Sequence, residues 1–136
     1  MKYLCLVYYE ERSPGVLPDL PETFIEEDLE YLEALRQGGY HIAASPLQPV
    51  ETATTIRVRN GTVTIHDGPA TSAPEQLGGF YLIDARDLND AIRVAARMPP
   101  ARYGSVEVRP LKEICPTACR SSAPPNDYSV TARDGL

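Results

Sequence analysis

The stretch TTIRVRNGTVTIH at residues 54–66 contains two runs of alternating polar and apolar residues on either side of an Asn-Gly pair. Such alternation is typical of a β-strand with one buried face, and Asn-Gly between two such runs predicts a two-residue type I′ turn. The predicted apolar face consists of Ile56, Val58, Val63 and Ile65, and the polar face of Thr55, Arg57, Thr64 and His66. A β-hairpin therefore occupies the middle of the chain.

Before this hairpin, the sequence predicts a strand, a helix and a second strand. Residues 2–9 are rich in Tyr, Leu and Val, which is typical of a strand buried on both faces and central in its sheet. Helical spacing begins at Glu22, and a short strand is expected over residues 40–44. The apolar positions of the helix, which we expect to form its buried stripe, are Ile25, Leu29, Leu32 and Leu35.

After the hairpin, a loop is expected over residues 67–79, followed by a strand over residues 80–84. Asp87 and Asp90 resemble a capping box and predict the start of a second helix. The apolar positions of this helix are Leu88, Ala91, Ile92 and Ala95, and Pro99-Pro100 predicts its end. A last strand is expected over residues 105–109.

The order strand, helix, strand, hairpin, strand, helix, strand predicts an α+β fold of the ferredoxin-like βαββαβ type with an extra β-hairpin. Helices cover one face of such a sheet and leave the other bare. Because large exposed apolar faces are rare in monomers, we expect a homodimer in which a second sheet covers this face.

Length and charge limit the other partners. A chain of 136 residues has the size of one domain, which we place at residues 1–114, with residues 115–136 as a polar tail that is disordered by itself. The net charge of −6 argues against binding to nucleic acid or to an anionic membrane. The longest apolar stretch, at residues 3–9, is too short to cross a bilayer. With Lys2 alone before it and no small-residue cleavage pattern after it, this stretch does not resemble a signal peptide. A cytoplasmic location is expected.

Neither a metal nor a cofactor is predicted. Cys5 lies in the first apolar run and is expected to be a buried, reduced thiol. Cys115 and Cys119 lie in the tail without the further His or Cys residues that a zinc site needs. The chain also lacks the glycine-rich and histidine motifs of nucleotide-binding and metallopeptidase sites.

Two segments resemble a known family. The motif Asp67-Gly68-Pro69 and the stretch PPARYGSVEVRP at residues 99–110 are similar to the YCII-related family, and within it to the branch named for its DGPF motif. The resemblance implies a ferredoxin-like subunit that dimerises into an α+β barrel beside a polar cleft. It also implies relatives that are enzymes of small aromatic compounds, and a genetic link of the DGPF branch to alternative sigma factors.

The chain departs from the family pattern at two places. The residues after Pro69 lack the aromatic, glutamate and lysine side chains of the DGPF motif. Proteins of the YCII type are thought to use a His–Asp pair, and Asp28 stands where their helical histidine is expected. The family's own dyad is therefore not reproduced.

Candidate site residues come from the polar positions of the predicted strands and turns. His66 and Asp67 are the candidate catalytic residues, because an imidazole can act as acid or base near neutral pH. Asp67 also belongs to a sequence typical of a turn. The candidate ligand-binding residues are His41, Arg102, Tyr103, Glu107 and Arg109. The Arg102 guanidinium suits a carboxylate or phosphate, although structural ion pairs and a structural His41 are the alternatives.

Two functions stay open on this basis. The favoured one is a non-enzymatic dimer that binds a small molecule or serves as a regulatory or interaction module, linked to a sigma-factor system. The alternative is a cofactor-independent lyase, isomerase or hydrolase of a small carboxylate or aromatic substrate. It requires four polar residues to converge on one cleft, namely His66, Asp67, Arg102 and Glu107. A histidine bonded to a carboxylate in a concave pocket would favour the enzyme.

Overall fold

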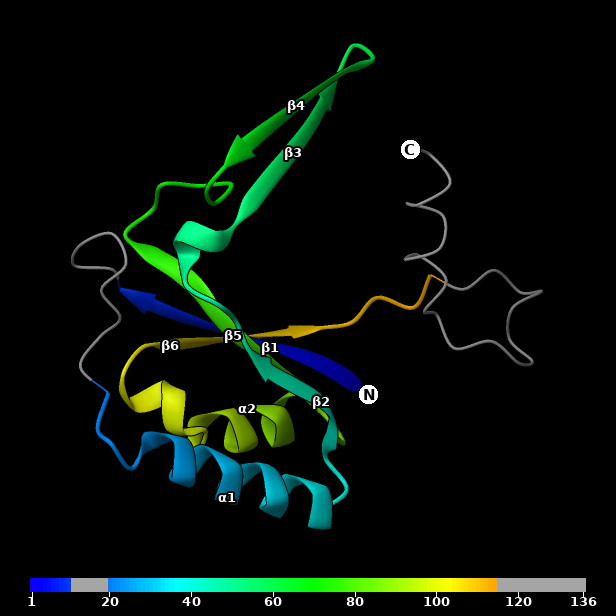
Figure 1. Cartoon of the computed structure of the whole chain (residues 1–136). Helices are drawn as coiled ribbons and strands as arrows, with labels where there is room; N and C mark the ends of the chain where they lie inside the picture. The colour runs from blue at the N-terminus through cyan, green and yellow to red at the C-terminus, as the bar shows by residue number, and fades with distance from the viewer. Residues whose placement is uncertain (11–19, 115–136) are drawn as a thin grey trace.

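The computed structural model describes residues 1–10 and 20–114, so the predicted tail with Cys115 and Cys119 lies outside the described residues. The elements are β1 (Lys2–Glu10), α1 (Phe24–Gln37), β2 (His41–Pro46), the short helical turn η1 (Val50–Thr52), β3 (Thr54–Arg59), β4 (Thr62–Asp67), β5 (Glu75–Asp84), α2 (Leu88–Ala96), the turn η2 (Pro99–Arg102) and β6 (Ser105–Pro110). Both helices lie on the same face of a sheet, and the β3–β4 hairpin projects away from them (Figure 1).

The main sheet has four antiparallel strands in the order β2-β5-β1-β6. β1 lies between β5 and β6, which confirms the prediction that the first strand is central. This order, with two helices on one face, is consistent with the predicted ferredoxin-like α+β fold.

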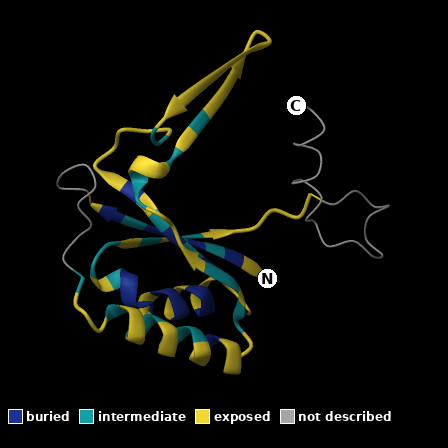
Figure 2. Cartoon of the chain, viewed as in Figure 1, coloured by how far each residue is buried: buried dark blue, intermediate teal, exposed yellow. Residues whose placement is uncertain are grey.

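The core lies between this sheet and the helices. Successive side chains of a strand point to opposite faces, and the alternate residues Tyr3, Cys5 and Val7 of β1 are buried. They pack with Tyr81 and Ile83 of β5 and with the buried side of α2. The buried residues gather along this layer, whereas the projecting hairpin is almost entirely exposed (Figure 2).

The predicted buried stripes of both helices are wrong in part. In α1, Ile25 is 69% exposed and Leu29 is 61% exposed, and the helix instead turns its positions 28, 31, 32 and 35 toward the protein. In α2, Leu88 and Ile92 are exposed, while Asp90 is buried beside Ala91, Val94 and Ala95. The side of each helix that faces the protein includes an aspartate, Asp28 or Asp90, whereas hydrophobic spacing predicts that an aspartate faces solvent.

The hairpin forms as predicted. Ile56 pairs with Ile65 and Val58 with Val63. Asn60 and Gly61 have φ angles of 52° and 76°, as a type I′ turn requires.

β5 starts at Glu75 rather than at Phe80, where the sequence predicted it. The strand is longer because residues 75–79 pair with the end of β1, residues 7–10. The buried Gln76 amide also donates hydrogen bonds of 2.8 Å to the carbonyls of Thr71 and Ala73. These bonds hold the preceding loop against the strand.

Candidate functional site

The two predicted catalytic residues lie at the base of the projecting hairpin. His66 and Asp67 are exposed residues at the end of β4. The turn that follows is held by two hydrogen bonds to residues around the start of β3: the Gly68 N–H donates to the Ala53 carbonyl at 2.7 Å, and the Thr55 hydroxyl donates to the Gly68 carbonyl at 2.8 Å. Gly68 has a φ of 127°, a conformation that favours glycine. The motif thus anchors the hairpin.

Arg102 and Tyr103 lie where η2 meets the start of α1. The Arg102 guanidinium donates to the Glu27 carboxylate at 2.6 Å and lies 5.8 Å from the centre of the Tyr103 ring. That ring packs edge-on against Phe24. The arrangement ties α1 to η2, and the guanidinium already has a carboxylate partner.

The remaining predicted residues lie elsewhere. Glu107 and Arg109 are exposed on β6 and form an ion pair of 3.8 Å. His41 starts β2 and pairs with Ile83 of β5. Within residues 1–10 and 20–114, neither histidine takes part in an ion pair or a side-chain hydrogen bond to a carboxylate. The predicted site residues are therefore not brought together in one cleft.

The structure instead assembles a polar pair that the sequence did not single out as a site. Asp28 comes from the inward side of α1 and Tyr81 from the core face of β5, and the Tyr81 hydroxyl donates a hydrogen bond to Oδ1 of Asp28. The pair lies in a pocket of about 50 Å³ between α1 and the β2–β5 side of the sheet. Its apolar wall includes Val7, Tyr9, Phe24, Leu32, Pro46 and Pro100.

Two glycines shape the wall of this pocket. A Cβ at Gly78 would lie 2.5 Å from the Tyr9 ring, so the ring packs against bare backbone. A Cβ at Gly79 would lie 3.1 Å from the Ser45 carbonyl, where β2 approaches β5. Two signals in the sequence could have pointed to this place. Asp28 stands where the helical histidine of the YCII type is expected, and glycine in a strand, as in the Gly-Gly pair, often marks a close approach of backbone or ligand.

Burial controls the charges in the pocket. It raises the pKa of the Asp28 carboxyl, and the hydrogen bond from Tyr81 lowers it by a smaller amount. Burial and the charge of Asp28 raise the pKa of Tyr9 to about 12. Burial, followed by the bond to Asp28, also raises the pKa of Tyr81. Both phenols stay protonated at neutral pH, and Asp28 is the source of negative charge among the described lining residues.

Comparison with known proteins agrees with the resemblance seen in the sequence. The model of the YCII-related domain matches residues 1–115. The chain belongs to the YCII-related domain family. An uncharacterized protein of Rhizobium meliloti (strain 1021) is 34% identical to it over 118 residues, which cover 82% of this chain and 92% of that protein.

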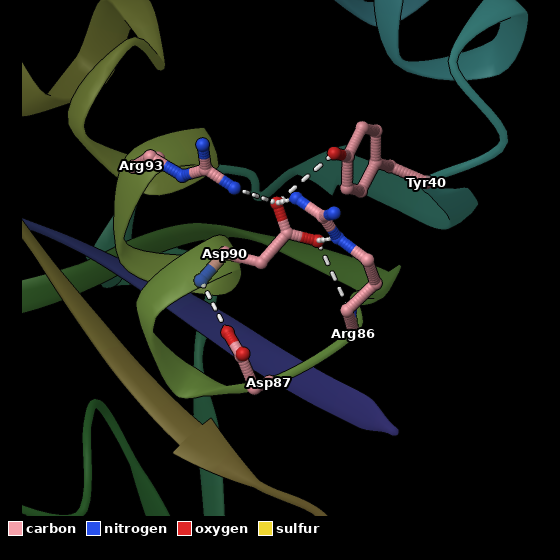
Figure 3. Close-up of polar contacts among 5 residues, drawn as sticks. All are labelled: Tyr40, Arg86, Asp87, Asp90 and Arg93. Atoms are coloured by element: carbon pink, nitrogen blue, oxygen red, sulfur yellow. Dashed lines mark hydrogen bonds and ion pairs between the residues drawn. The ribbon is translucent and has the colours of Figure 1, made fainter.

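This YCII-related domain contains a second inward-facing carboxylate, Asp90 (Figure 3). It is 2% exposed and accepts bonds from the Arg86 N–H at 3.0 Å, the Tyr40 hydroxyl at 3.0 Å and the Arg93 guanidinium at 2.8 Å. The Arg86 backbone bond and the other donors hold the pKa of Asp90 well below its usual range, against the effect of its burial. Since both oxygens are engaged, Asp90 stabilises the fold and is not available to a ligand.

Three further properties of the described part of this YCII-related domain concern metal binding, the cysteine thiol and membrane spans. These residues contain no group of three His, Cys, Asp or Glu side chains that could hold a metal ion. Burial raises the pKa of the Cys5 thiol to about 11, so it stays protonated and unreactive. None of the described helices is long and apolar enough to span a membrane.

Proposed function

We propose that this YCII-related domain is a non-enzymatic binding module for a small, mainly apolar molecule that carries a hydrogen-bond donor. The half-buried Asp28 carboxyl carries this proposal. One of its oxygens receives the Tyr81 bond, and within the described residues no side chain donates to the other. Every fully buried side-chain N or O atom of the described residues has a hydrogen-bond partner. Since the second Asp28 oxygen has none among these residues, it is not fully buried. A donor on a ligand can therefore reach it.

The composition of the pocket favours some ligands over others. Most of its exposed wall is apolar, and its volume of about 50 Å³ suits a small apolar group or the edge of a ring rather than a whole ligand. The described wall contains no basic side chain, and the nearby Arg102 is bound to Glu27. A carboxylate ligand would thus meet Asp28 without a compensating cation. An ammonium or hydroxyl group would instead gain a charge-assisted hydrogen bond.

Three probes that share one ring test this preference: benzylamine, benzyl alcohol and benzoate. We expect the amine and the alcohol to shift the backbone amide signals of Ala44, Ser45, Gly78 and Gly79 in NMR titrations at neutral pH. Benzoate should bind at least about tenfold more weakly, which corresponds to roughly 1.4 kcal/mol. The Asp28→Asn variant should lose most of the amine's advantage over benzoate.

Asp67→Asn is the matched control, since it removes one carboxylate from the exposed base of the hairpin. It should leave all three titrations unchanged. Equal binding of the three probes, stronger binding of benzoate, or shifts centred away from the pocket would refute the proposal.

The raised pKa of Asp28 beside a tyrosine hydroxyl favours one alternative, a cofactor-independent enzyme in which Asp28 transfers a proton. Such an enzyme would consume a probe of the class that binds, and Asp28→Asn would stop this while Asp67→Asn would not. If the NMR spectra of the probes do not change after prolonged incubation with the protein, the enzyme is excluded for these probes and the binding module is supported. The link to a sigma-factor system stays a prediction of the family resemblance.

We also propose that the domain forms a homodimer through the sheet face opposite the helices, here called the open face, as in the predicted dimeric α+β barrel. Strand alternation places half-buried apolar residues on this face, and the register sets them side by side. They are Leu4, Leu6, Phe80 and Leu82. Glu107 and Arg109 lie next to them on β6 and would form a polar rim.

A further inference from the structure

The β3–β4 hairpin, here called the arm, exposes a continuous apolar face. Four large side chains on one side of the ribbon are between 56% and 70% exposed. They are Ile56, Val58, Val63 and Ile65, which face one another in pairs across the two strands. An arrangement of this kind differs from single apolar residues scattered over a surface, which need no explanation.

The arm has no partner strand in the described part of the chain. β3 and β4 pair only with each other and form a sheet separate from the four-stranded one. An isolated two-stranded hairpin is marginally stable in water and gains stability by packing its apolar face. The side chains of Thr55 and Arg57 donate to the carbonyls of Gly68 and Ala70 at the base of the arm. These bonds fix the direction of the arm but do not bury its apolar face.

The direction of the arm indicates what covers it. Figure 1 shows the arm projecting away from the layer of helices, toward the side of the open face. A second copy placed on the open face would therefore lie beside the arm. The arm alone is too small for a stable interface, which buries roughly 800 Å² on each partner. Together, the arm and the open face would offer two apolar surfaces to the same occupant.

Charge supports the same occupant. The arm carries two arginines, Arg57 and Arg59, and a single carboxylate, Asp67, whereas the whole chain has a net charge of −6. Placed on a second copy, the arm, with two arginines and one carboxylate, adds no like-charge repulsion against a protein that is negative overall.

We propose that the arm packs its apolar face against a second copy of this chain, so that two arms clasp the dimer. This rests on the dimer proposed above and adds a contact that the open face alone does not provide. The two proposals make different predictions, because the arm and the open face carry different residues.

The test compares lysine substitutions at neighbouring positions of β4. Ile65→Lys places a charge on the apolar face of the arm, and Thr64→Lys places the same charge on its opposite face. We expect sedimentation equilibrium of the full chain to show a dimer dissociation constant raised at least about tenfold by Ile65→Lys and less than about threefold by Thr64→Lys. Ile65→Thr keeps a β-branched side chain in the strand and should weaken the dimer in the same direction.

Photocrosslinking identifies the occupant. Benzoylphenylalanine at position 65 should give a covalent dimer, whereas the same group at position 64 should not. Crosslinks from position 65 only to residues of the same chain, or equal effects of the two lysines, would refute the arm contact. A dimer that Leu6→Lys dissociates but Ile65→Lys does not would refute the arm contact alone. A monomeric wild-type protein would refute the dimer and the arm contact together, and none of these results bears on the pocket at Asp28.

Discussion

Two aspartates in the buried stripes of the helices have opposite roles because their surroundings differ. Asp90 accepts bonds from backbone and side-chain donors and has a lowered pKa, whereas Asp28 accepts one tyrosine hydroxyl and has a raised pKa. The first carboxylate is fully satisfied and stabilises the fold. The second has an oxygen to which no described side chain donates, and we propose that a ligand binds there. The number of donors around each carboxylate thus separates a structural residue from a candidate binding residue.

The Asp90→Asn variant tests the structural role. A carboxyl whose pKa is lowered by folding stabilises the protein above its unfolded pKa, near 3.8, and this contribution is lost as the pH falls toward the folded pKa. We therefore expect Asp90→Asn to lower the denaturation midpoint at pH 7, with a difference from wild type that shrinks as the pH falls below about 4. Chemical denaturation over a pH series measures this.

Glu26→Gln is its control, because it removes the same charge from an exposed position in the first turn of α1. It should leave both the midpoint and its pH dependence close to wild type. A pH-independent effect of Asp90→Asn would mean that its charge is not what stabilises the cluster.

At the scale of elements, close backbone approaches set where the strands lie. A Cβ at Gly104, just before β6, would lie 2.1 Å from the Tyr8 carbonyl oxygen of β1. The obstructing atom belongs to the backbone of the central strand, so it cannot move aside as a flexible side chain could. The glycine in the stretch at residues 99–110 is thus required by packing between two strands.

Gly104→Ala should therefore lower the free energy of unfolding by about 1–3 kcal/mol, the usual cost of overpacking. Gly38→Ala is the comparison: Gly38 has an ordinary φ of −77°, and its added Cβ would meet the edge of the Tyr40 ring at 3.0 Å. We expect a smaller loss there. Urea denaturation of both variants checks the order, and an equal or greater loss for Gly38→Ala would contradict it.

At the scale of the whole molecule, both described helices cover one face of the sheet, and no helix of residues 1–10 and 20–114 lies on the other face (Figure 1). The apolar residues at the centre of that face come from the two middle strands, β1 and β5. The proposed homodimer would bury them and leave the Glu107–Arg109 pair at its edge.

The variant Leu6→Lys should dissociate this dimer, because it places a charge at the centre of the proposed interface. We expect sedimentation equilibrium to show a dissociation constant raised about tenfold or more. Lys2 already occupies the end of the same strand, and Lys2→Leu, which removes a charge at the exposed rim, should change the constant little. Retention of the wild-type constant by Leu6→Lys, with its circular dichroism unchanged, would exclude the open face as the interface.

The sequence by itself determined the elements whose information is local. Period-two alternation with Asn60-Gly61 predicted the hairpin and its register, and Asp87 predicted the start of α2, where its side chain accepts the Asp90 N–H at 2.8 Å. In both cases, neighbouring residues specify the backbone conformation without help from distant parts of the chain. The family followed from the motifs at residues 67–69 and 99–110, which needed no knowledge of the fold.

Only the tertiary structure decided which polar residues meet. His66, Arg102 and Glu107 looked like one site in the sequence but lie on separate elements, and each has a local setting of its own. Asp28 and Tyr81 are 53 positions apart, and they meet because α1 packs on β5 with an aspartate in its buried stripe. Hydrophobic periodicity predicts that a carboxylate faces solvent. A buried carboxylate can therefore be recognised only when the tertiary structure shows the donor that binds it.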